Sequence, residues 1–191
     1  MDRIKSAYEK ALERFQQKKE VSAEEIARLE HLDTGKSIAA AYLRNSGVDL
    51  RAELGKQPDE IKKYIAEGIE ETLLHNIHLP ADESGREATK KALEGLFQIK
   101  EDKQSIGELL GQLEHLFNYY ARSYHQTYQN FKEAFSAKLS SAVEKRTGHR
   151  IKLDPEKHPA FREEWMRTVA QLNAQYESLL QEQKERIKEI Q

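Results

Sequence analysis

Apolar residues recur in steps of three and four along two long segments of the chain, 105–147 and 159–191. This spacing places them on one face of an α-helix. In the first segment they also repeat at intervals of eleven, as in Phe117, Tyr128 and Leu139, which corresponds to about 3.67 residues per turn and a nearly straight helix. The first helix alone would span roughly 60 Å. The pattern therefore predicts a long antiparallel, coiled-coil-like hairpin that projects from a more compact body.

Charge divides the first of these segments into two parts. Between Leu109 and Phe131 only Glu114 and Arg122 are charged, whereas charged residues are frequent beyond Phe131. A helix with so little solvated surface is typical of the centre of a bundle. We expect a single all-helical domain over residues 1–191, made of short helices in 1–104 that pack on 105–131, a projecting hairpin at 132–175 and the return of the last helix at 176–191.

This arrangement makes two specific predictions about side chains. Counting back from the loop that joins the long helices places Trp165 within about one turn of Leu139. Phe117 should lie in the core of the bundle, whereas Phe161, near the tip, should be less buried. Substitution by alanine should therefore destabilise the protein more at Phe117 than at Phe161.

Residues 1–104 carry the start and stop signals of several shorter helices. An amphipathic pattern predicts a first helix over 1–15, and Ser22 begins a capping box for a second. Pro58 opens a later helix that Pro80 closes, and Ser84 is the predicted cap of the next one. No segment shows the apolar–polar alternation of a strand. The predicted fold class is all-α, a helical bundle extended by the hairpin.

The composition is typical of a soluble helical protein. Charged residues make up 34% of the chain and the formal net charge is -2, so we do not expect a general polyanion binder. The absence of cysteine excludes disulfides and cysteine catalysis, and it agrees with a reducing, cytoplasmic location. No uncharged apolar stretch approaches about 20 residues and no signal-peptide pattern is present, so we expect neither a membrane span nor secretion.

The sequence Asp-Thr-Gly-Lys-Ser at 33–37 ends like a phosphate-binding loop. That motif requires a glycine where Glu30 stands, and it requires a preceding strand where the pattern is helical. We therefore interpret Gly35 as a kink or a close-packing point between helices.

The wider segment 22–45 has some features of a helix-turn-helix. Lys36 and Arg44 could contact phosphates, although Glu30 and Asp33 would lie close to the DNA and the chain lacks a basic face. A DNA-binding transcriptional regulator that uses this segment is the alternative function, and nucleic acid is not the partner we favour.

Glu71, His75 and His78 are spaced by four and three residues, which places all three on one side of a helix. Imidazole and carboxylate groups suit zinc or iron, but further ligands would have to come from elsewhere in the chain. We predict no metal or cofactor here and leave the question of metal binding at these three residues open.

The loop between the two long helices is rich in cations. Gly148 stops the first helix, and Pro155 and Pro159 restart the chain after the loop. A loop that a rigid scaffold holds out is a common place for binding residues. The loop is therefore the predicted binding site for an acidic partner protein, through Arg146, His149, Arg150, Lys152 and Lys157.

The sequence offers little support for catalysis. It contains no nucleophile elbow, no glycine-rich cradle and no carboxylate pair that differs from the ordinary charges of amphipathic helices. We predict a non-enzymatic protein–protein interaction module with an adaptor, chaperone-like or assembly role. A second copy of the chain is a further candidate partner.

Overall fold

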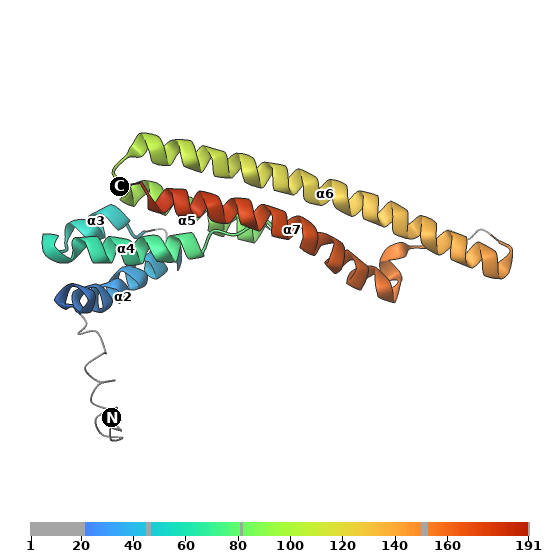
Figure 1. The fold of residues 1–191 in the computed structure, drawn as a ribbon, viewed down its shortest axis with the longest axis horizontal. Helices are drawn as coiled ribbons and strands as arrows, with labels where there is room; N and C mark the ends of the chain where they lie inside the picture. The colour runs from blue at the N-terminus through green and yellow to red at the C-terminus, as the bar shows by residue number, and fades with distance from the viewer. Residues whose placement is uncertain (1–21, 45–46, 81, 150–152, 191) are drawn as a thin grey trace, which may run out of the picture.

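The structure is a computed structural model that describes residues 22–44, 47–80, 82–149 and 153–190. Within these residues it contains helices and no strand, so the predicted all-α fold class is confirmed. The predicted helix over 1–15 lies outside the described residues. Figure 1 shows a group of short helices at one end and two long helices that run away from it. The helices are α2 (Ala23–Arg44), α3 (Leu50–Gly55), α4 (Asp59–His75), α5 (Glu83–Ile99), α6 (Lys103–Thr147), the 3₁₀ helix η1 (Pro155–Lys157) and α7 (Pro159–Lys188).

Several helix signals in the sequence act where they were expected, but the helix that follows Pro58 ends at His75 and not at Pro80. The Ser22 hydroxyl accepts a hydrogen bond from the Glu25 backbone at 3.1 Å, as a capping box requires. Gly148 ends α6 in the left-handed conformation, with φ of 73°. The predicted cap at Ser84 is wrong, because the Asp82 side chain caps α5 instead and accepts from the Gly85 backbone at 2.7 Å.

Helices α2 and α4 touch through their backbones at two glycines. A Cβ atom added to Gly35 would lie 2.1 Å from the Ile65 carbonyl oxygen, and one added to Gly68 would lie 2.1 Å from the Leu32 carbonyl oxygen. Gly35 is therefore a close-packing point, as the sequence indicated. Ion pairs flank the contact and join the same two helices: Arg28 with Glu67, Lys63 with Glu24 and Lys36 with Glu71.

The central helix of the short-helix group is α4, which contacts α2, α3 and α5. Its Ile65, Ile69 and Leu73 are fully buried.

The prediction that Leu109–Phe131 is the central helix of the bundle is wrong, because α4 holds that position and α6 contacts mainly α7. In the low-charge part of α6, from Leu109 to Phe131, the buried residues are Leu109, Leu113 and Tyr120, and Tyr119 is 64% exposed. The exposed side of this part of α6 consists mainly of asparagine, glutamine and histidine. These side chains are polar without being charged, so the absence of charge did not mean burial.

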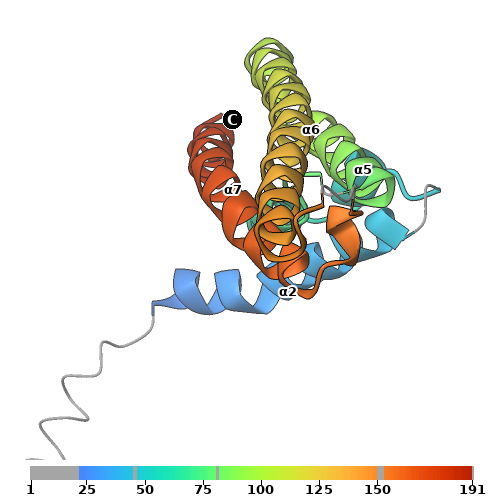
Figure 2. The same ribbon diagram turned by 90° about the vertical axis from the view of Figure 1, so that its right-hand side faces the viewer.

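Helices α6 and α7 lie side by side and run in opposite directions (Figures 1 and 2). Aromatic rings fill the seam between them, with centroid separations of 5.3 Å for Tyr120 and Tyr176 and 5.1 Å for Tyr128 and Trp165. The predicted proximity of Trp165 to Leu139 is therefore wrong by about three turns of helix.

The connection between the two helices explains this difference. It does not turn back at the end of α6 but returns along α6, where Glu156 of η1 binds Lys132 and accepts a hydrogen bond from the Tyr128 hydroxyl at 2.7 Å. Helix α7 consequently begins opposite Phe135, and the end of α6 extends past it (Figure 1).

The expected ranking of two phenylalanines is also reversed. Phe161 is only 6% exposed and its ring lies among those of Tyr128, Phe131 and Phe135, at 5.0 to 6.3 Å between centroids. Phe117 is half-buried. The start of α7 therefore has a small aromatic core of its own.

Candidate functional site

The far end of α6 carries two of the described residues of the predicted binding site, Arg146 and His149. Arg146 lies in the last turn of α6, and His149 follows the terminal Gly148. Both side chains are exposed. Arg150 and Lys152 lie outside the described residues.

The structure separates Lys157 from Arg146. Lys157 belongs to η1, which the Glu156–Lys132 ion pair holds against α6. At about 1.5 Å per residue, position 146 lies roughly 20 Å along α6 from position 132. Arg146 and Lys157 therefore do not form one compact cluster.

The acidic side chains of the connection are engaged within the protein. Hydrogen bonds from Lys132 and Tyr128 hold the pKa of Glu156 below its usual value, and the same contact with Glu156 raises the pKa of Lys132. Asp154 caps η1 by accepting from the Glu156 backbone at 3.2 Å and lies 3.8 Å from the Lys157 ammonium.

The cations at the end of α6 have no such partners. Lys145 and Arg146 are exposed and form no ion pair with another described residue. Their position in the last turn is favourable in itself, because the carboxyl end of a helix attracts positive charge. The end of α6 therefore keeps its positive charge available to solvent.

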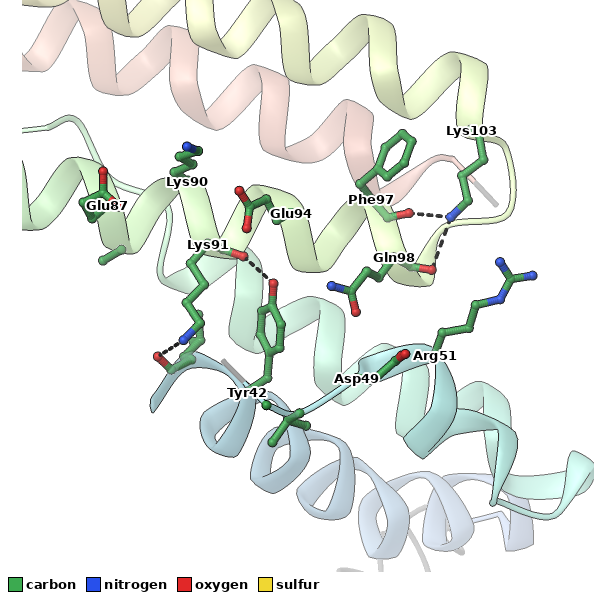
Figure 3. Close-up of a pocket in the computed structure, with 14 residues that line it drawn as sticks. Tyr42, Asp49, Arg51, Glu87, Lys90, Lys91, Glu94, Phe97, Gln98 and Lys103 are labelled. Carbon is green, nitrogen blue, oxygen red and sulfur yellow. Dashed lines mark hydrogen bonds between the residues drawn. The ribbon is translucent and has the colours of Figure 1, made fainter. Parts of the chain in front are cut away.

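A separate hollow of 820 Å³ lies between the end of α2, α3 and α5 (Figure 3). Two of its lysines bind backbone carbonyls: Lys91 donates to the Leu43 carbonyl at 3.0 Å and Lys103 donates to the Gln98 carbonyl at 3.2 Å. The Tyr42 hydroxyl donates to the Lys91 carbonyl at 3.1 Å, and burial together with the charge of Glu94 raises its pKa.

The remaining lining of this hollow carries charges of both signs, among them Arg51, Glu87, Lys90 and Glu94. These groups do not form a nucleophile with a base, and they favour no particular ligand charge. Sequence reasoning missed the hollow because its residues come from three separate segments without a shared motif.

The predicted placement of Glu71, His75 and His78 on one side of a helix is wrong, because α4 ends at His75 and His78 follows it outside the helix. The Glu71 carboxylate lies 3.6 Å from the Lys36 ammonium, and the rings of His75 and His78 meet edge to face at 6.1 Å. In the part of the chain that the structure describes, no group of three histidine, aspartate or glutamate side chains could hold a metal ion.

The predicted helix-turn-helix, on which the alternative function as a DNA-binding transcriptional regulator depends, is wrong. Residues Ala23–Arg44 form one continuous helix, so the turn of a helix-turn-helix is missing. Asp33, Gly35 and Lys36 lie within this helix, which leaves no loop to hold a phosphate. The helix continues through Gly35, which lies against the backbone of α4.

None of the helices in the described ranges is both long enough and apolar enough to cross a membrane. No curated protein and no solved structure matches the chain. The model of one family of unknown function, DUF6657, matches residues 51–189. This match covers α3 to α7 and includes the end of α6 and the connection that follows it. The chain therefore belongs to the DUF6657 family.

Proposed function

We propose that this protein is a non-enzymatic protein–protein interaction module with an adaptor, chaperone-like or assembly role in the cytoplasm. Its contact surface is the basic tip, defined as Lys145, Arg146, His149, Arg150 and Lys152. One observation carries the proposal: the end of α6 extends past the start of α7 and exposes Lys145 and Arg146 without an ion-pair partner among the described residues.

The charge of the basic tip favours an acidic partner. The nearest acidic groups of the connection are occupied, Glu156 by Lys132 and Asp154 by the η1 cap. A hollow of 720 Å³ lies beside the connection and is bordered by Ser136, Ser140 and Leu153. Leu153 is 38% exposed, so an apolar side chain of the partner could be buried next to the charged contact.

The proposal is tested by capture of partners from native cytoplasm. Wild-type protein and the double variant Lys145→Glu/Arg146→Glu are immobilised, and the captured proteins are identified by mass spectrometry. Both side chains are exposed, so the variant should fold normally. It should lose acidic partners, and capture by the wild type should weaken with salt, because about 0.1 M salt screens exposed charges beyond roughly 10 Å.

A matched control reverses two positive charges at another place on the protein surface. The double variant Arg86→Glu/Lys90→Glu on α5 alters two exposed cations far from the basic tip in sequence and should retain the partners. If the tip variant and the wild type capture the same acidic proteins, the basic tip is not the contact surface.

A further inference from the structure

One side of the α6–α7 pair carries apolar and uncharged polar side chains that are exposed or half-buried. On α6, Tyr119, Ser123 and Gln126 follow each other in steps of four and three, and on α7, Leu172 and Leu179 are two turns apart. Tyr119 is 64% exposed and Leu179 is 46% exposed. We call this surface the neutral face; it also includes Gln112, Asn130 and Gln175.

The parts of the neutral face on α6 and α7 lie on the same side of the pair. Arg186 of α7 donates a hydrogen bond from Nη1 to Oε1 of Gln112 at 2.9 Å. A hollow of 450 Å³ is lined by Ser123 and Gln126 of α6 together with Leu172 of α7. In Figure 2, α5 lies on the other side of α6 from α7. The exposure of Tyr119 and Leu179 shows that no described element covers these two side chains.

Charge is almost absent from this part of the pair. Residues 109–131 of α6 contain only Glu114 and Arg122, and residues 168–181 of α7 contain only Glu177. Glu114 and Glu177 do not follow the spacing of the neutral face. Arg122 does, three residues after Tyr119 and four before Gln126, and it lines the hollow of this face. The cores of protein interfaces are depleted in charge and enriched in tyrosine. The neutral face therefore has the composition of an interface and differs from the charged surface of the rest of the chain.

We propose that the neutral face binds a second copy of this chain, so that two α6–α7 pairs form a four-helix interface. A two-fold interface brings the same surface of both copies together. Glutamine and asparagine amides both donate and accept hydrogen bonds. The amides of one copy can therefore form hydrogen bonds with the same amides of the second copy. Tyr119 supplies the aromatic anchor, and Leu172 and Leu179 supply the apolar surface around it.

The available area agrees with a dimer of modest affinity. Residues 112–130 span close to 30 Å and two adjacent helices are roughly 20 Å wide, which gives about 600 Å² for each copy. The total of about 1,200 Å² lies at the lower end of specific interfaces. We therefore expect a dimer whose population depends on protein concentration.

Sedimentation equilibrium of the full chain tests the proposal. Wild-type protein should be dimeric at about 100 µM and dissociate on dilution. The double variant Tyr119→Glu/Leu179→Glu should weaken dimerisation roughly thirty-fold or more, because it places like charges at the centre of the interface. Met166→Glu is the matched control, since Met166 is 52% exposed on α7 but does not follow the spacing of the neutral face. It should dimerise like the wild type.

A second measurement does not depend on the folding of the glutamate variants. The chain has no cysteine, so Tyr119→Cys introduces a single thiol. Mild oxidation should link this variant into a covalent dimer at protein concentrations where Met166→Cys remains unlinked. The proposal is overturned if wild-type protein is monomeric at about 100 µM, if the double glutamate variant dimerises as the wild type does, or if both cysteine variants link equally. These experiments leave the basic tip unchanged and are therefore independent of the partner capture.

Discussion

Gly35 and Gly68 set the distance between α2 and α4. Each lies against a carbonyl oxygen of the other helix, and a backbone atom cannot move aside as the end of a flexible side chain can. Gly35→Ala should therefore lower the free energy of unfolding by about 1 to 3 kcal/mol, the usual cost of overpacking, despite the better helix propensity of alanine. Chemical denaturation measures the change.

The same substitution at Gly111 should have the opposite sign. Gly111 lies inside α6, and nothing approaches within 4 Å of the position of its Cβ. Gly111→Ala should stabilise the protein by up to about 1 kcal/mol, since alanine forms helix more readily than glycine. Equal effects of the two substitutions would show that α2 and α4 are not in backbone contact.

Lys100 is the most buried cation of the described chain. Its side chain is 7% exposed, it forms an ion pair with Glu70 at 2.9 Å and it donates to the Ile190 carbonyl at 2.6 Å. Lys100→Met would leave Glu70 buried without its counter-charge. We expect a loss of about 3 to 5 kcal/mol in unfolding free energy at pH 7.

The pH dependence of this loss follows from the Glu70 carboxyl. Burial raises its pKa above the usual 4.5, and Lys100 partly offsets that effect. A carboxyl whose pKa rises on folding stabilises the fold below pH 4.5 and loses that contribution as the pH rises through the folded-state pKa. Without Lys100 the pKa should rise further, so the difference between wild type and Lys100→Met should shrink as the pH falls from 7 toward 4. Denaturation curves at both pH values measure it, and a constant difference would exclude the ion pair as its cause.

At the scale of elements, the start of α7 should contribute more stability than the middle of α6. Phe161 is buried among three aromatic rings, whereas Phe117 is half-buried. Phe161→Ala should lower the free energy of unfolding by about 3 to 5 kcal/mol. Phe117→Ala should lower it less, because solvent already reaches the Phe117 side chain. Thermal melts that rank the two in the other order would contradict the aromatic core at the start of α7.

Sequence periodicity predicted the long helices well and their register poorly. The spacing of apolar residues in steps of three and four depends only on the helix that contains them. The end of α6 at Gly148 is likewise determined by residues close in sequence. Register depends on the path of the connection, and the Glu156–Lys132 pair that fixes this path joins residues 24 positions apart. The cations of the basic tip lie close together in the sequence, so the sequence alone was enough to propose them, and their role in binding stays a prediction. The hollow of Figure 3 and the neutral face could not be predicted from the sequence, because each combines separate elements.

At the scale of the whole molecule, the last turns of α7 close the core of the short-helix group. Ile187 and Leu180 are buried in one apolar cluster with Ile69, Ile106 and Leu113. The Lys100 ammonium holds the Ile190 carbonyl beside them. A residue in the last turns of a helix usually contributes little to stability, since helix ends fray. Here the last turns of α7 pack in the same core as α4 and the start of α6.

Ile187→Ala should therefore destabilise the short helices as well as α7. We expect a loss of about 2 to 5 kcal/mol, and amide hydrogen exchange should accelerate in α4 as well as in α7, because both contribute to the same apolar cluster. Met166→Ala, at an exposed site of α7, should change stability by no more than about 0.5 kcal/mol. Faster exchange confined to α7 would mean that the two long helices open independently of the short ones. Faster exchange in both would mean that the C-terminal turns of α7 join the long pair and the short helices into one cooperative unit.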